Sequence, residues 1–578
     1  MIVPLLFLLY ILILLSSTEA DDVVVTTNLG KLRGKLQTYD NGNVSVYLGI
    51  HYAKAPVAEL RFRKPVAIGA WSGILNATQY GPACSQSSRT SMSEDCLVLN
   101  IYVPETRHTK AVMVWIHGGG YVAGQGTTNG APLALVGDVI VVGINYRLDV
   151  FGFISTGDSS SRGNYGLWDQ LMALRFIKDN IASFGGDPQK ITIFGESAGG
   201  YSVGLLILSP QSKGLFHRAI CQSGVGISPR TLAFDAVRFT QDLSDRLNCT
   251  VLDSQGRLDT ISFMKCLRNQ PARKILDASV NVRKAKNLAW RLKMAPVVDG
   301  KLIPADPRHL ITPSNQFYNP MVDIDLMAGV LNGDGVLILW PLTKFQKQLG
   351  FNVKDGIPAR VFCENISTSI AVDYFPTEKG HVAQRLCQQY SSKRYSDSEQ
   401  ARQVVNMYGD MMFAAPTLRT LQAHARHSNK KTTYHYVFSH QRVNARPPWF
   451  RGAKHAEELE FVFGYTSARN TTLAKQMMRY WTNFAKFGNP NGEMGSTKVA
   501  WQPFDETQRA YLNLDDIITP GYNLWSQRMV FWLTLSRRKN SDPQLSTPTS
   551  RAVSSTCMHK PLPLWVAGFY FAKMGLFI

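Results

Sequence analysis

Residues 191–199 read Ile-Thr-Ile-Phe-Gly-Glu-Ser-Ala-Gly, and the architecture we expect follows from this stretch. Its β-branched apolar start predicts a buried strand, and the following residues, 200–208, can continue as a helix. Gly195 and Gly199 stand two positions before and two after Ser197, where a tight strand-to-helix turn has no room for a bulky side chain. Ser197 is therefore expected in a strained conformation, with its hydroxyl exposed at a helix N-terminus that favours negative charge.

A nucleophilic serine needs donors for the oxyanion that forms when it attacks a carbonyl. The apolar run 111–116 predicts a buried strand, and His-Gly-Gly-Gly follows it at 117–120. Successive glycines let backbone N–H groups face one point, so the expected oxyanion hole is formed by Gly119, Gly120 and Ala198. The alternatives are a plain turn or a phosphate loop, but a phosphate loop requires Lys-Ser/Thr, and residues 121–123 are Tyr-Val-Ala.

The serine also needs a base and an acid that orients the base. Asp334 follows an apolar strand pattern, Ala-Gly-Val-Leu at 328–331, and its alternative role is that of a turn residue capping the next helix. His455 lies in Gly-Ala-Lys-His-Ala-Glu-Glu-Leu-Glu-Phe, and its alternative is a surface histidine, as expected for most of the twelve in the chain. The chain order of serine, acid and histidine is that of α/β-hydrolases.

Several further motifs resemble the carboxylesterase/cholinesterase family, the type-B carboxylesterases of the α/β-hydrolase fold, from about Val24 to Phe531. The matching landmarks are 93–102 (SEDCLVLNIY), 145–153 (NYRLDVFGF), 163–170 (GNYGLWDQ), 184–188 (FGGDP), 222–224 (QSG) and 460–464 (EFVFG). The resemblance implies an α/β fold with a large, mostly parallel central sheet flanked by helices in a single catalytic domain with insertions. It also implies that Ser197, Asp334 and His455 form the catalytic triad, with no cofactor and no metal.

The chain departs from the family at the acid, since most members have Glu where this chain has Asp334. The resemblance further implies buried ion pairs of Arg61 with Glu94 and of Arg147 with Asp169. It implies disulfides between Cys84 and Cys96 and between Cys249 and Cys266. Elimination then pairs Cys363 with Cys387. Cys221 lies in the apolar run 219–221 and is expected to be a buried free thiol, and Cys557 is left either to link two chains or to be removed with the tail.

The two ends of the chain differ from its body. Residues 1–20 begin with an apolar run and predict a secretory signal peptide, with a membrane anchor as the alternative. Residues 21–536 are expected to form the carboxylesterase domain, and 537–578 a low-complexity tail that is either a lipid-anchor signal or an amphipathic or disordered segment. We therefore expect a secreted or lipid-anchored cell-surface glycoprotein. Its glycosylation sequons are at Asn43, Asn76, Asn248, Asn365 and Asn470.

The charge of the chain does not indicate nucleic-acid binding. The formal net charge is +20 over 578 residues, but the basic residues are scattered and lack an aromatic-interleaved motif. His424 and His427 stand one helical turn apart, and without a third ligand nearby they predict a surface helix rather than a metal site.

The expected partner is a small-molecule carboxylic ester, and the residues favour a general carboxylesterase. Cholinesterases hold choline on a tryptophan inside the first disulfide loop, whereas residues 85–95 contain no aromatic side chain. Leu292 and Met294 are expected where the family's acyl pocket has aromatics, which suits larger acyl groups.

A choline esterase stays open, because Glu196 can attract cations. A non-catalytic adhesion or binding homologue is the third alternative, although such members usually lose the serine or the histidine. The oligomeric state is not predicted.

Overall fold

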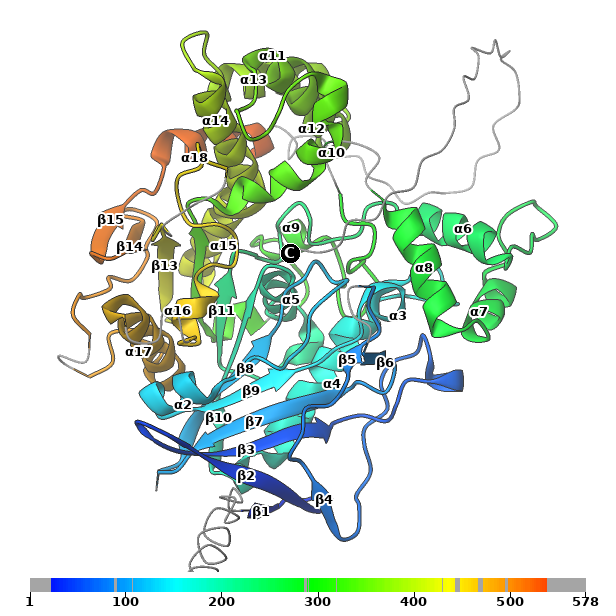
Figure 1. The fold of residues 1–578 in the computed structure, drawn as a ribbon, viewed down its shortest axis with the longest axis vertical. Helices are drawn as coiled ribbons and strands as arrows, with labels where there is room; N and C mark the ends of the chain where they lie inside the picture. The colour runs from blue at the N-terminus through cyan, green and yellow to red at the C-terminus, as the bar shows by residue number, and fades with distance from the viewer. Residues whose placement is uncertain are drawn as a thin grey trace, which may run out of the picture. The chain divides into compact units, whose positions relative to one another are not determined.

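A large mixed sheet organises the molecule (Figure 1). The computed structural model describes residues 22–537 except 88–90, 107, 285–287, 289–290, 319, 429, 442–446, 466–470 and 494–496. Residues 1–534 form one compact unit, and of the second unit, 535–578, only the end of one helix is described. The predicted signal peptide, the predicted tail beyond Arg537, Asn470 and Cys557 all lie outside the described residues. The predicted boundaries at residues 20 and 536 stay predictions.

The sheet is parallel in its centre and antiparallel at its edges. Its order is β1-β2-β3-β7-β9-β8-β10-β11-β12-β13-β14-β15, with β4 paired to β2. All neighbours from β9 to β14 are parallel, and the pairs from β1 to β9 along this order and β14 with β15 are antiparallel. The strands are β1 (Asp22–Thr26), β2 (Lys31–Tyr39), β3 (Gly42–His51), β4 (Ile74–Asn76), β7 (Val98–Pro104), β8 (Lys110–Ile116), β9 (Ile140–Ile144), β10 (Gly186–Glu196), β11 (Arg218–Gln222), β12 (Asp325–Leu331), β13 (Thr433–Phe438), β14 (Ala510–Leu514) and β15 (Thr519–Tyr522), and β5 (Ala83–Cys84) pairs with β6 (Met92–Ser93).

Helices connect the parallel strands and cover the sheet, as crossover connections require. The α-helices are α2 (Ala131–Gly137), α3 (Asp149–Phe153), α4 (Tyr165–Asn180), α5 (Ala198–Leu206), α6 (Ala236–Leu247), α7 (Thr260–Arg268), α8 (Ala272–Arg283), α9 (Pro307–Leu310), α10 (Leu339–Leu349), α11 (Ala359–Val361), α12 (Ser367–Tyr374), α13 (Lys379–Tyr390), α14 (Asp397–Gly409), α15 (Ala415–His427), α16 (Leu459–Val462), α17 (Thr472–Phe487) and α18 (Ser526–Arg537). The short 3₁₀ helix η5 (Asp334–Ile338) follows β12, and the π-helix η7 (Asp410–Ala414) joins α14 to α15. The mostly parallel sheet flanked by helices confirms the predicted fold class.

The central strands carry continuous apolar side chains because both faces of the sheet are covered. All seven residues of β8, which contains the predicted apolar run 111–116, are buried, and so are all five of β9. Trp115 of β8 and Phe194 of β10 pack with Trp481 of α17 in one core. The helix that follows β10 directly, α5, packs on β10 and β11, so the strand–turn–helix around Ser197 lies in the middle of the sheet.

The two predicted ion pairs are present and tie loops to helices. Arg147 Nη2 lies 2.7 Å from Asp169 Oδ1, with exposed side-chain fractions of 3% and 0%. Arg61 pairs with Glu94, and the same guanidinium donates to the carbonyls of Arg268 and Gln270. Since a buried charge is tolerated only when it is paired, these contacts fix loop positions relative to the sheet.

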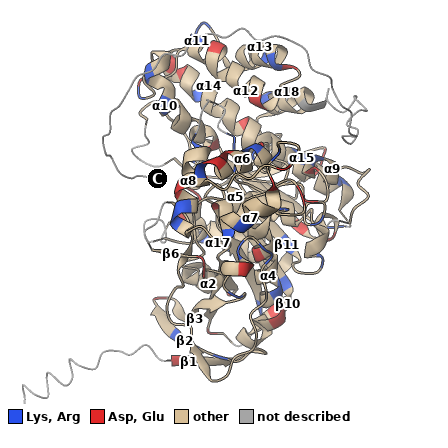
Figure 2. Cartoon of the chain, turned by 90° about the vertical axis from the view of Figure 1, so that its right-hand side faces the viewer, with Lys and Arg blue, Asp and Glu red and all other residues tan. Residues whose placement is uncertain are grey.

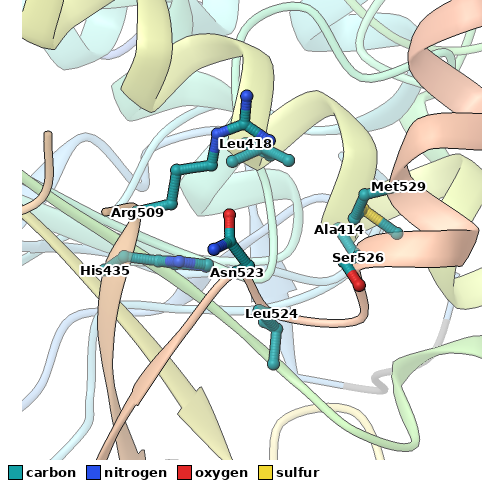
Figure 3. A pocket seen from close by; sticks show the side chains of 8 residues that line it. All are labelled: Ala414, Leu418, His435, Arg509, Asn523, Leu524, Ser526 and Met529. Atoms are coloured by element: carbon teal, nitrogen blue, oxygen red, sulfur yellow. The ribbon is translucent and has the colours of Figure 1, made fainter. Parts of the chain in front are cut away.

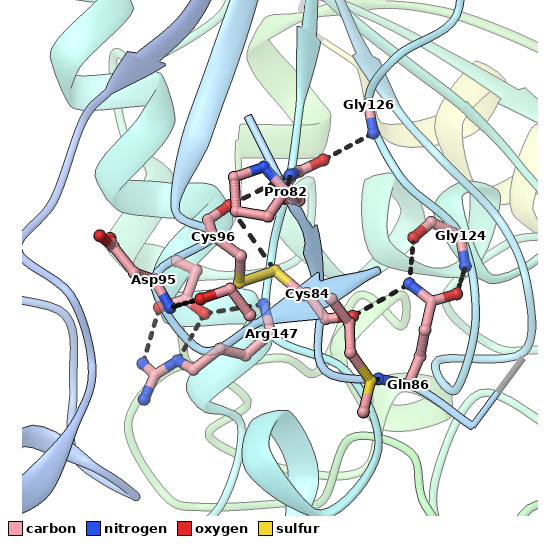
Figure 4. Close-up of a disulfide and its surroundings, with 12 residues drawn as sticks. Pro82, Cys84, Gln86, Asp95, Cys96, Gly124, Gly126 and Arg147 are labelled. Atoms are coloured by element: carbon pink, nitrogen blue, oxygen red, sulfur yellow. Dashed lines mark hydrogen bonds and ion pairs between the residues drawn. A yellow bond between two sulfur atoms is a disulfide. The ribbon is translucent and has the colours of Figure 1, made fainter. Parts of the chain in front are cut away.

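All three expected disulfides are formed: Cys84–Cys96, Cys249–Cys266 and Cys363–Cys387. Cys221 is free and buried, as expected. Beside the first disulfide, the Gln86 side chain donates to the carbonyls of Cys84 and Gly124 and accepts from Gly124 N (Figure 4). This disulfide loop therefore holds the segment that follows the glycine run 118–120.

Two expectations about individual side chains are wrong. His424 is on α15 as expected but is fully buried, bonded to the Thr433 hydroxyl at 2.7 Å and the Ile324 carbonyl at 2.9 Å. Met294 is 1% exposed and packs in the core beneath α6, α7 and α8, so it is a core residue rather than an open pocket wall. The burial of both side chains is determined by tertiary packing, and a local sequence pattern carries no information about that packing.

The formal net charge of the chain is +20, and its basic residues are spread over several elements. Figure 2 shows lysine and arginine on separate elements, among them β2, β10, α8 and α13, with acidic residues between them. Of the predicted glycosylation sites, Asn76 and Asn248 are exposed and Asn43 and Asn365 are half-buried. Within the described ranges, no helix combines the length and the apolar character that a membrane span requires.

Replacing Asp169 with Asn should destabilise the fold strongly. The substitution leaves the buried Arg147 charge without its partner, and breaking a buried pair costs about 3–5 kcal/mol. The matched control is Asp277→Asn, which breaks a pair with Arg273 whose side chains are 62% and 56% exposed. Urea unfolding should show a much lower midpoint for Asp169→Asn and an unchanged one for the control. Equal midpoints in the two variants would contradict a stabilising role for the pair.

Candidate active site

Ser197 lies at the turn between β10 and α5 in a backbone conformation that is rare for a side-chain-bearing residue, with φ 55° and ψ −120°. Its N–H donates to the Gln222 carbonyl at 2.9 Å, and its carbonyl accepts from Tyr201 N at 2.8 Å. The turn fits because Gly199 has no side chain: a Cβ there would lie 1.9 Å from the Ile116 carbonyl oxygen. Such strained residues persist only where the surroundings hold them, as at functional sites.

The glycine run after β8 lies beside this turn. A Cβ on Gly118 would lie 2.7 Å from a Glu196 carboxylate oxygen and 3.1 Å from Ser197 Cβ. Gly119 adopts φ +105° and Gly120 φ +61°. In the part of the chain that the structure describes, no hydrogen bond occupies the N–H groups of Gly119 and Gly120. Ala198 is the first residue of α5, where an N–H has no acceptor within the helix.

Asp334 and His455 are brought together from segments 121 residues apart. His455 Nδ1 lies 2.8 Å from Asp334 Oδ1. The other carboxylate oxygen of Asp334 accepts from the Ser223 hydroxyl and from Leu331 N, each at 2.8 Å. Asp334 begins η5, but its side chain does not cap that helix. The carboxylate therefore has the contacts of a group that orients a histidine.

The other nitrogen of His455 faces Glu196 instead of Ser197. His455 Nε2 lies 3.0 Å from Glu196 Oε1, and the two side chains are 10% and 5% exposed. Within the described ranges, no hydrogen bond joins the Ser197 hydroxyl to His455. The imidazole thus lies between two carboxylates and makes no described hydrogen bond to the serine hydroxyl.

This position changes the protonation of His455. Burial lowers the pKa of the imidazole, but Glu196 and Asp334 together outweigh burial and raise the pKa to about 10. At neutral pH the imidazole is therefore a cation in an ion pair with both carboxylates.

A third buried carboxyl group, Glu458, lies three residues after His455. It accepts from Gln222 Nε2 at 3.0 Å, and Trp481 Nε1 donates to the same Gln222 side chain at 3.1 Å. Burial first, and the nearby Glu196 and Asp334 charges next, raise the pKa of Glu458. Glu458 and Ser223 were not predicted from the sequence, although Glu458 stands only three residues after His455, in the turn before α16.

His435 is not a competing base. It is 3% exposed, and burial lowers its pKa to about 3. The cavity beside it has a volume of only about 10 Å³, enough for one water molecule (Figure 3). His435 is therefore a neutral core residue.

One group of side chains has the spacing of a metal site among the residues that the structure describes. Donor atoms of His440, Asp515 and Asp516 lie within 4.8 Å of one another, and Asp516 is exposed. His440 Nδ1 lies 3.0 Å from Asp516 Oδ1 and 3.7 Å from Asp515 Oδ1, so the imidazole already contacts both carboxylates. None of the three residues touches Ser197 or His455.

Comparison with known proteins gives one consistent family. The family model described as "Carboxylesterase family" matches residues 21–532. Mouse (Mus musculus) neuroligin-3 is 33% identical over 87% of this chain and 67% of its own length, and human (Homo sapiens) neuroligin-2 is 32% identical over 93% and 71%. Bovine (Bos taurus) bile salt-activated lipase is 34% identical over 85% of this chain and 83% of its own.

The charge on His455 can be measured directly. The NMR resonance of its Nδ1–H should titrate with a midpoint near pH 10, the value to which the carboxylates raise the pKa. Glu196→Gln removes one of these carboxylates, so the midpoint should move to lower pH. His455→Gln identifies the resonance by its loss. Since the pKa of the folded state is the higher one, the ion pair stabilises the fold fully below about pH 6.5 and loses this effect as the pH rises through 10. An unchanged midpoint in Glu196→Gln would contradict the contact.

Proposed function

The chain belongs to the carboxylesterase family, and on this premise we propose that it is a serine carboxylic ester hydrolase that acts through an acyl-Ser197 intermediate. The observation that carries the proposal is the convergence of three groups at one place. These are the strained Ser197 turn, the free N–H groups of Gly119 and Gly120, and the His455–Asp334 pair.

In the first half-reaction the Ser197 oxygen attacks the ester carbonyl and His455 takes the hydroxyl proton. The negative charge on the tetrahedral oxygen is stabilised by the N–H groups of Gly119, Gly120 and Ala198, and each such donor is typically worth roughly 10²–10³ in rate. His455 then gives the proton to the leaving alcohol. Water attacks the acyl-enzyme with the same base and donors, which releases the acid and restores the serine.

The mechanism requires that His455 leaves its contact with Glu196. A cationic imidazole cannot accept a proton, so only the fraction that is neutral and turned toward Ser197 reacts. Hydrogen bonds of this kind are often long or absent before substrate binds. Glu196 therefore competes with Ser197 for Nε2, and activity should rise with pH as His455 loses its proton.

The same contact supports a second candidate, a binding protein that does not hydrolyse esters. His455 held as a cation between Glu196 and Asp334 leaves Ser197 without a base. In this case Ser197, Asp334 and His455 are all present, but ester hydrolysis is slow or absent. Measurement of turnover decides between the two candidates.

The proposed substrate is a general carboxylic ester rather than a choline ester. The loop closed by Cys84–Cys96 has no aromatic side chain to hold a quaternary ammonium group, although Glu196 remains a negative charge beside the serine. The proposal includes an extracellular location, secreted or lipid-anchored, which the three disulfides favour because such bonds persist in oxidising compartments.

Ser197→Ala should abolish hydrolysis of p-nitrophenyl butyrate by the purified protein. The substitution removes the nucleophile and leaves the backbone turn in place, so circular dichroism should match the unsubstituted protein. Ser202→Ala, on the next turn of α5, is the matched control and should keep turnover. Acetylthiocholine measured in parallel should be the poorer substrate. Turnover that survives Ser197→Ala would refute the assigned nucleophile, and no turnover in folded unsubstituted protein would favour the binding candidate.

Asp334→Asn should lower kcat by about 10⁴, because an amide holds the histidine in the wrong tautomer and does not stabilise its charged form. Asp323→Asn, just before β12, is the control and should leave kcat unchanged. A near-normal kcat in Asp334→Asn would assign the acid to another residue.

A further inference from the structure

We propose that a cavity between α14, α18 and the segment leading to His455 binds a small organic anion with an apolar body. The cavity has a volume of about 370 Å³, within the range of small-molecule sites. It is distinct from the Ser197 site: neither Ser197 nor His455 lines it. In Figure 1, α14 and α18 lie next to one another, as the cavity lining requires.

The cavity lining is strongly positive. Arg402, Arg451 and Arg528 line it, and the described lining contains no aspartate or glutamate. Guanidinium groups are the side chains best suited to bind carboxylate, sulfonate or phosphate groups, because they offer several donors in one plane.

These arginines are only partly neutralised by their neighbours. Arg451 donates to the carbonyls of Pro448 and Phe450, which carry no net charge, at 2.7 and 2.8 Å. Arg402 lies 4.0 Å from the exposed Glu399, at the limit of an ion pair.

Arg528 has the closest acid. Its Nε lies 3.3 Å from Asp410 Oδ2, and burial raises the pKa of Asp410 to about 6. At neutral pH three positive groups therefore meet two carboxylates, and neither carboxylate lies in the cavity.

Aromatic and amide groups complete the site. Phe450 is 1% exposed and lines the cavity, and the Arg528 guanidinium lies 4.5 Å from the centre of the Trp525 ring. Asn332 and Asn406 add amide donors. A ligand with a charged head and a flat or aliphatic body matches this combination better than an inorganic ion does.

The cavity touches both segments that carry the proposed acid and base. Asn332 stands two residues before Asp334, and its Oδ1 accepts from Ala453 N at 2.7 Å. The Phe450 ring packs on Gly333, where a Cβ would lie 2.4 Å from Cζ, and Gly333 pairs with Lys454 in a parallel bridge. A bound anion therefore braces residues 450–455, the segment that ends at His455.

Isothermal titration with 1-naphthalenesulfonate tests the site in the full secreted protein. The double variant Arg402→Gln with Arg451→Gln should weaken binding at least tenfold. The control is Arg257→Gln with Arg273→Gln, which removes the same charge from arginines that are 71% and 62% exposed. The control should bind as the unsubstituted protein does, and neutral 1-naphthalenesulfonamide should bind at least tenfold more weakly. Equal sulfonate affinity in the two double variants, or equal affinity for the neutral compound, would overturn the proposal.

Hydrogen exchange tests the link to His455 without an activity measurement. Saturating 1-naphthalenesulfonate should slow amide exchange at Arg451–His455 in the unsubstituted protein and not in the Arg402/Arg451 variant. Unchanged exchange in that segment, with the probe bound, would overturn the bracing role. Because neither readout uses ester turnover, the result is independent of the proposed hydrolase activity.

Discussion

The close approach of α5 to the end of β8 is the constraint on which the site depends. At Gly199 the Ile116 carbonyl lies where a Cβ would be, so helix and strand meet backbone to backbone. Ser197 lies at the turn before α5 with a positive φ of 55°, and the glycine run after β8 begins beside it, since a Cβ on Gly118 would lie 3.1 Å from Ser197 Cβ. The loop closed by the first disulfide also restrains the glycine run, because Gln86 is hydrogen-bonded to Gly124, which lies just after that run. The proposed oxyanion hole therefore depends on the packing of the backbone around this turn and not on a catalytic side chain.

A second constraint is the group of buried carboxyl side chains around His455. Glu196, Asp334 and Glu458 are all at most 5% exposed, and one imidazole lies among them. With Glu458 protonated, two carboxylates and one imidazolium leave a single negative charge; with Glu458 ionised they would leave two, which agrees with the raised pKa of Glu458. The arrangement stabilises the imidazolium of the proposed transition state. It also stabilises the same cation in the resting state. The net gain for catalysis is therefore the stabilisation of the imidazolium in the transition state minus its stabilisation in the resting state.

Much of this arrangement could be predicted from the sequence, and the reasons are physical. The strand–turn–helix at 191–208 and the apolar run 111–116, which lies in β8, are local patterns, so they predicted the centre of the fold. The chain order of Ser197, Asp334 and His455 and the family motifs identified residues that the structure brings into one region. The Glu196–His455 contact could not be foreseen, because it depends on the direction of two side chains. His424 and Met294 were misplaced for the same reason: burial of a single position depends on what packs against it from elsewhere in the chain.

Asp334 stands where the family resemblance leads us to expect a glutamate. A side chain shorter by one methylene must start nearer to the histidine. Here the backbone turns into η5 at Asp334 itself, and the bridge between Gly333 and Lys454 draws the two segments together. The carboxylate then reaches Nδ1 at 2.8 Å while its second oxygen is held by Ser223 and Leu331 N. Since three bonds fix this group, the orientation of His455 at Nδ1 is rigid, and the freedom that remains lies in the choice of Nε2 between Glu196 and Ser197.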